Sequence, residues 1–516
     1  MSSSNNSLID EYDTSLGYHP SVLPLDIRLG LTKPTNIHTT NDDNNNDDDN
    51  ESSTTTTHLK WGILGCSKAS NDFVHALHFL SSSGLPHTIV AVGSRSADRA
   101  SSFADLHDIP NVHDSYEELC SDPEINIVYV GTLHPYHKSH AEMALFCGKH
   151  VLIEKPICMT SADAIYLYDL SRKLHLFVGE GMWTRFFPVV EWTRCHLGEE
   201  NLANLTNHNE AESMEQQQRN EDLQMNPIGT VRVITADFSI DGTDVGPYPT
   251  DSLFSKDAGG GCSWTTLPYI LSAAMMPFDA IMPEGIVAHG ILPEDDYHDV
   301  DNVGDLAIGL TLTFDNTAID PTTLTGKKKK KKDDPDAHRV GLERWNAPRK
   351  IPEKKSIANG LCGFLAETSE RTVYAGKRGR IVIEGPGHCP TEACIVRKSK
   401  GRGVGMGNSA AMNDDDDDDS DDASENNHHD NHNHNKPSTR TTNVTFPLPH
   451  PTPEMESSDA TFQMPNSMGF IYEAEAVRRL IGAGRIFFPQ WTPKDSVGCI
   501  RIVEEVLRQV KGEEEE

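Results

Sequence analysis

From Leu59 onward the chain alternates short apolar runs with stretches whose apolar residues recur at helical spacing. Such alternation is typical of β-α-β units that build a parallel sheet. The apolar runs predict six strands, at Lys60–Leu64, Thr88–Val92, around Val112, Ile127–Gly131, His150–Ile153 and Leu176–Gly179. We therefore expect a doubly wound parallel sheet of the Rossmann type in residues 58–182.

Helix boundaries between these strands can also be located. Ser115 is followed three residues later by Glu118, which is the spacing of a capping box. Thr160 or Ser161 can cap a helix that runs to about Lys173, and Gly148 lies where the end of a helix favours glycine. The predicted helices therefore separate the predicted strands, as a parallel sheet requires.

The second half has a different pattern, with alternating apolar and polar positions and few helical stretches. Strands are predicted at Val231–Ile240, Leu306–Phe314 and Arg380–Ile383. This pattern predicts an α+β domain over residues 183–512, built on an open, largely antiparallel sheet. The fold class is α/β overall, with two domains.

Polar segments interrupt this pattern. Residues 1–57 form a polar tail that becomes acidic toward its end, and insertions rich in polar residues occupy about 199–226, 320–355 and 398–443. Segments without large apolar residues cannot bury enough surface to offset the loss of chain entropy. We interpret the tail as disordered and the insertions as surface loops or disorder.

Charge excludes some partners. The formal net charge is −33, but twenty acids lie in three tracts, Asn41–Glu51, Asn413–Asp430 and Glu513–Glu516. The remainder is mildly acidic, which disfavours nucleic acid and anionic membranes as partners. The basic run Lys327–Lys332 could be a nuclear signal or an anion patch, although a solvated loop is the simpler interpretation.

Cysteine and histidine patterns point to no metal. The ten cysteines form no C-x-x-C pair, and the histidines between His428 and His434 lie in an acidic tract, so we predict no metal site. The N-terminus lacks an apolar signal region, and no run of 18 apolar residues occurs. We expect a soluble cytoplasmic protein with reduced thiols.

The string WGILGCSKASNDF follows the first predicted strand and opens a helix, the context of a dinucleotide-binding turn. Ser67 and Ser70 replace the second and third glycines of G-x-G-x-x-G counted from Gly65. An ordinary strand-turn-helix is the alternative. The cofactor-binding residues predicted here are Gly62, Gly65, Cys66, Ser67 and Lys68.

The end of the second strand indicates which cofactor would bind. NAD-binding folds usually place an acid here for the ribose, whereas AVGSRSADRA offers Ser94, Arg95 and Arg99. Arginine and a hydroxyl suit a 2′-phosphate, through charge-assisted hydrogen bonds. We therefore predict NADP, with surface arginines at a helix start as the alternative.

Three further strings have a specific order and spacing: YVGTLHPYHKSHAEMAL, GKHVLIEKPICMT and GEGMWTRFFP. With them, the chain resembles the glucose-fructose oxidoreductase / inositol dehydrogenase / MocA (Gfo/Idh/MocA) family. WTRFFP and the later SMGFIYEAEAV resemble the branch of dimeric dihydrodiol and D-xylose dehydrogenases. The resemblance covers about 59–198, 227–318, 360–396 and 444–511. Each string alone would equally suit a strand end or a packed core.

The resemblance implies roles for matching residues. Lys155, Tyr269 and His137 would be catalytic: Tyr269 would transfer the proton, Lys155 would orient and tune it, and His137 would face the substrate. The remaining cofactor-binding positions that it implies are Thr132, His134, Glu154, Trp183 and Arg185. Oxidation of an alcohol needs a titratable group and a positive charge at the carbon that loses hydride, and this pair could supply both.

Substrate-side positions depart from the family pattern. Thr265 stands where the family has an aspartate, Leu267 replaces a glycine, and Pro268 precedes Tyr269. A proline distorts a helix interior unless it lies in the first turn. Arg232 and Phe238 match positions that the family uses near the substrate, and Thr265 occupies a third such position with a different residue. Ile291 stands where an arginine is expected.

These observations predict an NADP-dependent oxidoreductase that transfers hydride between nicotinamide and a hydroxyl-bearing carbon of a sugar or trans-dihydrodiol. The family likeness suggests a homodimer through the open sheet. An NADP-binding regulatory protein with weak or no turnover is the alternative, because Thr265 removes a carboxylate from the site. A scaffold organised by the charged tracts is a third interpretation.

Overall fold

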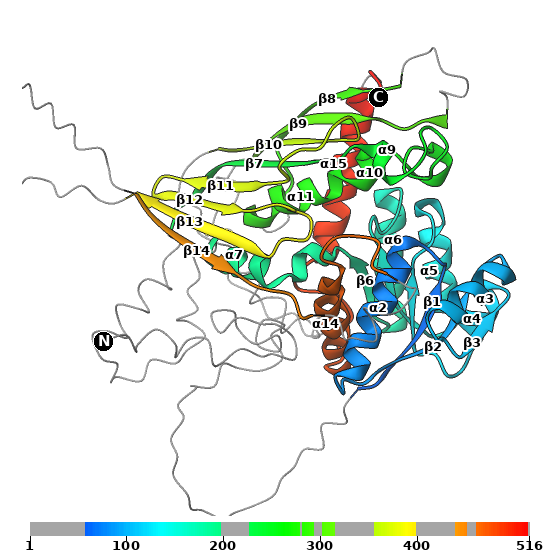
Figure 1. The fold of residues 1–516 in the computed structure, drawn as a ribbon. Coiled ribbons are helices and arrows are strands. Elements are labelled where there is room, and N and C mark those ends of the chain that lie inside the picture. Colours follow the sequence, from blue (N-terminus) through cyan, green and yellow to red (C-terminus); the bar gives the residue numbers. More distant parts are fainter. Residues whose placement is uncertain are drawn as a thin grey trace, which may run out of the picture.

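Six parallel strands organise the first part of the chain in this computed structural model, which describes residues 57–197, 227–278, 281–293, 302–314, 355–398, 439–450 and 461–513 (Figure 1). They are β1 (Leu59–Leu64), β2 (His87–Gly93), β3 (Asn111–His113), β4 (Ile127–Val130), β5 (His150–Glu154) and β6 (Val178–Gly181). Their order is β3-β2-β1-β4-β5-β6, with the switch point between β1 and β4. This is the order of dinucleotide-binding sheets, and the predicted fold class is confirmed.

Helices connect these strands: α2 (Lys68–Ser82), α3 (Ala97–Leu106), α4 (Tyr116–Ser121), α5 (His137–Phe146) and α6 (Ser161–Leu174). Ser115 caps α4 by accepting a hydrogen bond from the Glu118 N–H, and Thr160, not Ser161, caps α6. The strand predicted from Leu176 starts two residues later, at Val178. The reason is that the Leu176 N–H still closes the end of α6 by donating to the Ser171 carbonyl.

A second sheet has eight strands, in the order β14-β13-β12-β11-β7-β10-β9-β8. Their bounds are β7 (Val231–Ser239), β8 (Gly285–Ile291), β9 (Ala307–Phe314), β10 (Ser356–Gly363), β11 (Thr372–Gly376), β12 (Gly379–Ile383), β13 (Glu392–Lys398) and β14 (Thr439–Thr445). Only β7 and β10 pair in parallel within it, so the predicted largely antiparallel sheet is confirmed. β14 begins inside the segment interpreted as the third polar insertion, most of which lies outside the described residues, as do the other two insertions and the tail.

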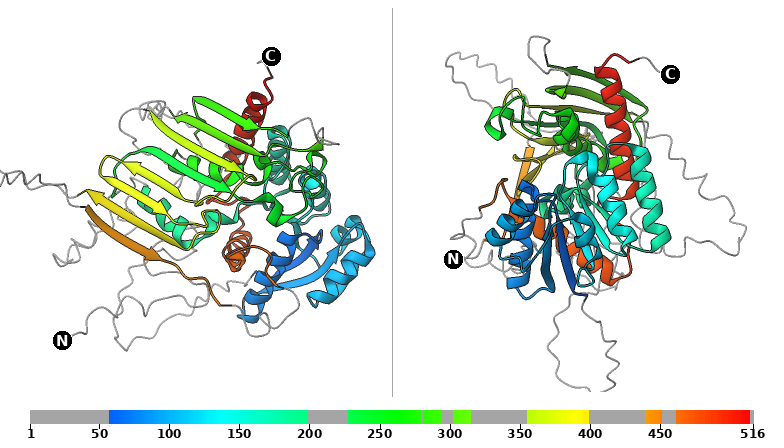
Figure 2. Two further views of the ribbon diagram at one scale, coloured as in Figure 1. Left: turned by 45° about the horizontal axis from the view of Figure 1, so that its top comes forward. Right: turned by 90° about the vertical axis from the view of Figure 1, so that its right-hand side faces the viewer.

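Helices cover one face of this sheet (Figure 2). α11 (Leu267–Met275) packs on β7 and β10, α7 (Pro188–Leu197) on β12 and β13, and α15 (Pro493–Val510) on β8. Burial alternates along β9, where every second residue is buried. The other face carries no helix in the described part of the chain.

Two late helices tie the domains together. α14 (Phe470–Gly482) packs against α2, although the two lie at opposite ends of the chain (Figure 1). α15 contacts α6 of the first domain as well as α11 and β8 of the second. The region between the two sheets is therefore fixed by elements from both ends of the sequence.

Candidate active site

The turn between β1 and α2 has the geometry of a phosphate-binding loop. Gly65 adopts φ +100°, and a Cβ there would lie 2.9 Å from the carbonyl oxygen of Gly131. Ser67 caps α2 by accepting from the Ser70 N–H at 3.0 Å, and the first turn of the helix holds no acid. The N-terminus of this 15-residue helix thus offers N–H groups and a positive dipole to an anion.

The residues predicted to recognise a 2′-phosphate lie beside this turn. Arg99 crosses from α3 and donates through Nη2 to the Cys66 carbonyl at 3.1 Å. Arg95 lies with its guanidinium 5.5 Å from the centre of the Tyr136 ring, and Ser94 is 7% exposed at the end of β2. The structure therefore brings two positive charges and a hydroxyl to the edge of the candidate phosphate site.

Two residues predicted to bind the cofactor make other contacts. Gly62 lies within β1, where a Cβ would meet Ile125 at 2.7 Å, so its role is packing. The ammonium of Lys68 donates to the carbonyl of Val245 in the second domain at 3.1 Å and so bridges the domains. Cofactor binding by Gly62 and Lys68 therefore stays a prediction.

The histidines after β4 hold the loop. His137 is fully buried, and its two ring nitrogens lie 2.8 and 2.9 Å from the carbonyls of Pro156 and Thr132. His134 lies 2.8 Å from the carbonyl of Gly259 in the second domain, and the Thr132 hydroxyl pairs with His140. His137 thus fixes the two loops that carry Thr132 and Lys155, and its catalytic role stays a prediction.

Lys155 and Tyr269 meet at the interface of the two domains. The ammonium of Lys155 lies 4.6 Å from the centre of the Tyr269 ring and donates to the Thr265 carbonyl at 2.7 Å. The Tyr269 oxygen accepts a 3.1 Å hydrogen bond from Trp183 Nε1. Within the described residues the hydroxyl hydrogen of Tyr269 has no acceptor, so it can bind an oxygen of a ligand.

Burial controls the protonation of this pair. It lowers the pKa of Lys155 to about 8, against the opposing charges of Glu154 and Glu180. Burial, followed by the charge of Glu154, raises the pKa of Tyr269 well above its usual value, although the bond from Trp183 lowers it. Lys155 is therefore the group of the pair that changes charge close to neutral pH.

Glu154 supports this arrangement from behind. Its carboxylate accepts from the Tyr129 hydroxyl at 2.6 Å and from the Lys155 N–H at 3.2 Å. Burial raises the pKa of Glu154, while the hydrogen bond from Tyr129 and the charge of Lys155 lower it. Glu154 thus belongs to the neighbourhood of Lys155, as its place in the sequence suggested.

The departures at Thr265 and Pro268 are explained by a broken helix. Thr265 ends α10 (Cys262–Thr265), and α11 starts at Leu267, so Pro268 lies in the first turn, where it removes no helical hydrogen bond. The Thr265 hydroxyl donates to the Gly261 carbonyl at 2.8 Å. It therefore turns back onto its own helix, while its carbonyl receives Lys155.

Asp305 stabilises the start of α10, and the sequence did not reveal this role. Its carboxylate accepts from the Ser263 N–H at 2.8 Å, from the Ser263 hydroxyl at 2.7 Å and from the Cys262 thiol at 2.9 Å. The N-cap position itself is Gly261, which has no side chain to do this. No local signal could link residues more than forty positions apart in the chain.

Two arginines do not reach the pair. Arg185 is 4% exposed and donates to both the side-chain oxygen and the carbonyl of Ser272, so its side chain anchors α11. Arg232 lies at the start of β7, six residues and roughly 20 Å along the strand from Phe238. The roles of Arg185 at the cofactor and Arg232 at the substrate stay predictions.

Aromatic rings surround Tyr269. Phe238 meets it edge to face with ring centres 5.4 Å apart, and Trp183 stacks on Phe470 at 4.4 Å. His388 lies 5.7 Å from Tyr269, ring centre to ring centre. His388 was not predicted as a site residue, because it lies in a loop more than a hundred positions beyond Tyr269.

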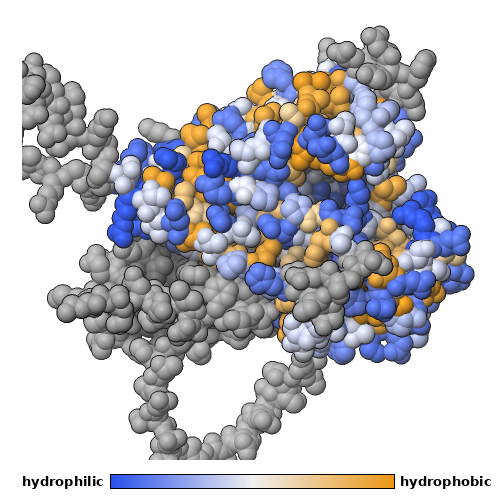
Figure 3. All heavy atoms as spheres, in the orientation of Figure 1, coloured by the Kyte–Doolittle hydropathy of each residue, from blue (hydrophilic) through white to orange (hydrophobic). Residues whose placement is uncertain are grey.

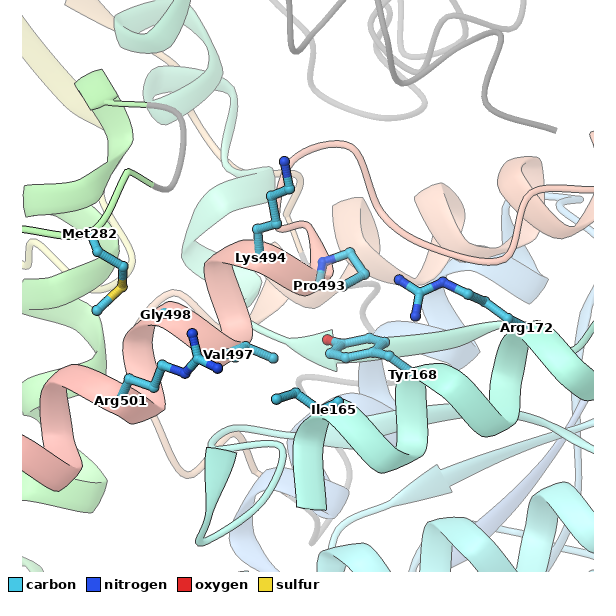
Figure 4. A pocket seen from close by; sticks show the side chains of 9 residues that line it. All are labelled: Ile165, Tyr168, Arg172, Met282, Pro493, Lys494, Val497, Gly498 and Arg501. Carbon is cyan, nitrogen blue, oxygen red and sulfur yellow. The ribbon is translucent and has the colours of Figure 1, made fainter. Parts of the chain in front are cut away.

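A separate cavity of about 340 Å³ lies between α6 and α15 (Figure 4). Arg172 of α6 and Arg501 of α15 are among its lining residues. None of the predicted site residues lines it. The turn between β1 and α2 and the Lys155–Tyr269 pair both lie outside its lining.

Comparison with known proteins agrees with this geometry. Residues 59–182 match the family described as GFO_IDH_MocA, oxidoreductase family, NAD-binding Rossmann fold. The trans-1,2-dihydrobenzene-1,2-diol dehydrogenase of Danio rerio is 32% identical over 268 residues, which cover 52% of this chain and 68% of that protein. The chain belongs to the Gfo/Idh/MocA oxidoreductase family.

Other Gfo/Idh/MocA relatives of the same name match a shorter region. The Xenopus laevis protein is 36% identical over 235 residues, 46% of this chain and 61% of that protein. The Homo sapiens protein is 42% identical over 147 residues, 28% of this chain and 43% of that protein. The chain thus spans less than two thirds of the length of these two relatives.

Solved structures share the fold of this Gfo/Idh/MocA chain. KijD10, a 3-ketoreductase from Actinomadura kijaniata in complex with NADP and TDP-benzene, superimposes with a TM-score of 0.54 at 17% identity, over 87% of this chain and 97% of that one. Levoglucosan dehydrogenase in complex with NADH and levoglucosan gives 0.58 at 14% identity, over 89% and 98%. At these identities the likeness establishes the fold alone.

None of the helices described for this chain is both long enough and apolar enough to cross a membrane. The described residues also contain no group of three or more potential metal ligands. The histidines at 428–434 and the lysine run at 327–332 lie outside the described residues.

Proposed function

We propose that this chain is an NADP-dependent dehydrogenase that transfers hydride between nicotinamide and a hydroxyl-bearing carbon of a trans-dihydrodiol or sugar. The observation that carries the proposal is the position of the Lys155 ammonium over the Tyr269 ring at the domain interface. The Tyr269 oxygen accepts a hydrogen bond from Trp183, so its own hydroxyl hydrogen remains available for a ligand. The names of the relatives support the reaction class.

The phosphates of a dinucleotide would bind at the N-terminus of α2, where Gly65 allows a close turn and Ser67 caps the helix. When bound, the oxidised nicotinamide supplies the hydride acceptor. Arg99 and Arg95 lie where a 2′-phosphate would follow the ribose, which supports NADP over NAD.

Proton transfer falls to the buried pair. In the direction of alcohol oxidation, the Tyr269 hydroxyl holds the substrate oxygen by a hydrogen bond, and neutral Lys155 accepts the hydroxyl proton as hydride leaves the same carbon. This reverses the roles expected from the family resemblance. The reason is that burial raises the pKa of Tyr269 well above its usual value but lowers the pKa of Lys155 to about 8.

The walls of the site favour a cyclic substrate. Trp183 and Phe238 are buried beside Tyr269, and each stacks one face on a further ring, Phe470 and His388 respectively. Aromatic faces pack against the apolar face of a ring, while a few polar atoms orient its hydroxyls. This supports a cyclic diol or a pyranose over an acyclic alcohol.

The test is reduction of NADP, with NAD as the control cofactor, by the full chain. The panel contains trans-dihydrodiols, D-xylose, other aldoses and inositols, and Lys155→Met and Tyr269→Phe are assayed alongside. We expect turnover with one substrate class and its loss in both variants. If NADP binds but no member of the panel is oxidised, the alternative of a regulatory NADP-binding protein replaces the dehydrogenase.

We also propose a homodimer through the uncovered face of the second sheet. Five apolar side chains on this face are 40–57% exposed, namely Val233, Val287, Ile291, Ile357 and Leu361. Apolar residues reach the surface over β8 and β9 (Figure 3). Leu361→Lys should shift the mass measured by light scattering from dimer to monomer, and a monomeric wild-type chain would exclude the dimer.

A further inference from the structure

His388 and Glu370 form a hydrogen-bonded pair beside Tyr269. The distance from His388 Nδ1 to Glu370 Oε2 is 2.8 Å, and the two side chains are only 11% and 13% exposed. The His388 ring centre lies 5.7 Å from that of Tyr269 and 6.1 Å from that of Trp183. A titratable pair thus borders the candidate catalytic residues without any part in the mechanism above.

Three separate segments hold the imidazole in place. Phe238 of β7 stacks on it with ring centres 4.4 Å apart and planes 3° from parallel. The Thr184 hydroxyl donates to the His388 carbonyl. The Glu370 N–H donates to the Asp237 carboxylate at 2.7 Å, which fixes the residue that orients the ring.

The backbone of Glu370 shows that tertiary contacts impose this arrangement. Glu370 adopts φ +51°, in the left-handed region, which costs a residue other than glycine about 1 kcal/mol. Asp237 receives three hydrogen bonds from this turn, two from backbone N–H groups and one from the Ser369 hydroxyl. The turn is therefore held in a conformation that Glu370 alone would not prefer.

The carboxylate of Glu370 determines what the other nitrogen of the ring can do. A carboxylate accepts the Nδ1–H, so the Nε2 atom of a neutral imidazole carries a free lone pair. Nε2 has no hydrogen-bond partner among the residues that the structure describes. In its neutral form His388 therefore presents a hydrogen-bond acceptor beside Tyr269.

In the proposed reaction Tyr269 and Lys155 both serve the reacting hydroxyl, so a second hydroxyl needs an acceptor of its own. Thr265 brings no carboxylate to the site, and its hydroxyl donates to the Gly261 carbonyl. The ammonium of Lys155 and the Tyr269 hydroxyl act as donors toward a ligand while both are protonated. A substrate with two neighbouring hydroxyls needs an acceptor for the hydroxyl that does not react.

We propose that His388 is a specificity-determining residue, whose Nε2 atom accepts a hydrogen bond from the substrate hydroxyl adjacent to the reacting carbon while Glu370 holds Nδ1. The proposal rests on the proposed function, because it places the substrate beside Tyr269. It assigns a partner to the second of the two neighbouring hydroxyls that trans-dihydrodiols and sugars share. Glu370 is a positioning residue that acts through His388.

Binding of two matched probes tests this proposal without turnover. The dissociation constants of trans-cyclohexane-1,2-diol and cyclohexanol are measured by calorimetry with the full chain saturated with NADPH, a complex that cannot oxidise an alcohol. His388→Phe keeps a ring against Phe238 but removes Nε2. We expect it to weaken diol binding about fivefold and to change cyclohexanol binding less than about twofold.

Two further variants separate recognition from structure. Glu370→Gln retains an acceptor for Nδ1–H, so the diol should lose less affinity than in His388→Phe. His113→Phe removes the imidazole of another histidine–carboxylate pair, in which His113 lies 3.0 Å from Asp122 on the first domain, and should change neither constant. Equal losses for both probes, an unchanged diol constant, or no diol binding to the wild-type chain would each overturn the proposal. Turnover in the substrate panel is scored separately, so the dehydrogenase can stand when this inference fails.

Discussion

The ammonium of Lys155 lies over the face of the Tyr269 ring, 4.6 Å from its centre, and is fixed there by the Thr265 carbonyl. A cation over an aromatic face is attracted by the ring quadrupole. In this buried position the two groups respond oppositely, because removal from water disfavours the charged form of each. The lysine loses its proton more easily, and the tyrosine keeps its own.

This pair predicts how activity depends on pH. Burial lowers the pKa of Lys155 to about 8, so the side chain is an ammonium below that pH and a neutral amine above it. In the proposed reaction the neutral amine accepts the proton, so the rate of alcohol oxidation should rise as the pH increases through about 8. Lys155→Met should lower the rate at least about a hundredfold and remove this rise. A wild-type profile that falls between pH 7 and 9 would assign the proton to another group.

Trp183→Phe tests the hydrogen bond to Tyr269. Loss of the 3.1 Å bond removes the contact that lowers the pKa of Tyr269 and orients its hydroxyl. We expect kcat to fall about tenfold, the effect of one bond of roughly 1.4 kcal/mol, with little change in NADP affinity. Trp192→Phe, at a similarly buried tryptophan in α7, is the matched control. A similar loss of kcat in both variants would point to packing instead.

Arg99→Gln tests the choice of cofactor. Arg99 reaches across the phosphate-binding turn to the Cys66 carbonyl, where a 2′-phosphate could form a charge-assisted bond. NADP binding should weaken about tenfold or more, since such bonds contribute roughly 1.5–3 kcal/mol, while NAD binding should be nearly unchanged. Arg172→Gln, at an exposed arginine paired with Asp169, serves as the control in the same fluorescence titration. Equal weakening for both cofactors would argue against 2′-phosphate recognition.

Replacing either of two buried glutamates on α14, Glu473 or Glu475, by glutamine should change the melting temperature in opposite directions. Glu473 is fully buried, and neither of its carboxyl oxygens has a hydrogen-bond partner in the described residues. Burial, and then the charges of Glu154 and Glu180, raise the pKa of Glu473 well above its ordinary value of 4.5. The folded protein binds the proton of Glu473 more tightly than the unfolded chain does. The contribution of this proton to the free energy of unfolding is complete below pH 4.5 and is lost as the pH rises from 4.5 through the raised folded pKa. Glu473→Gln should therefore raise Tm more at pH 8 than at pH 5.

Glu475 is the matched control on the same helix. Burial alone would raise its pKa, but hydrogen bonds from Arg478 and His87 hold the pKa of Glu475 at about 2. This contribution is present above pH 4.5 and is lost as pH falls toward 2. Glu475→Gln should lower Tm at pH 8. If thermal denaturation shows both variants shifting in the same direction at pH 8, the opposite assignments are wrong.

Asp305→Ala tests whether the Asp305 carboxylate stabilises the start of α10. Its carboxylate holds the start of α10, and the last residue of α10 supplies the carbonyl that receives Lys155. Unpaired buried donors at Ser263 should cost about 3 kcal/mol of unfolding free energy, measurable by urea denaturation. Turnover should fall as well, since the Thr265 carbonyl loses its position. Full stability in the variant would show that Gly261 and its neighbours hold the helix without the carboxylate.

Local patterns in the sequence determined the elements of this protein. Apolar runs placed the strands of the first sheet, and side-chain caps such as Ser115 and Thr160 marked where helices begin, because both depend on residues a few positions apart. The phosphate-binding turn at Gly65 and the arginines after β2 were also local signals. The tyrosine at 269 and the lysine at 155 were identified through family resemblance rather than from pattern alone.

Tertiary structure decided what those elements bring together. It buried His137 between two carbonyls, sent Lys68 to the second domain, and brought His388 and Glu370 to Tyr269. It also placed Asp305 beneath α10 and broke the helix at Thr266, which made Pro268 harmless. These outcomes depend on contacts between residues far apart in the chain and on the burial of charge. Periodicity and spacing record neither, because both are properties of neighbours along the sequence and not of neighbours in space.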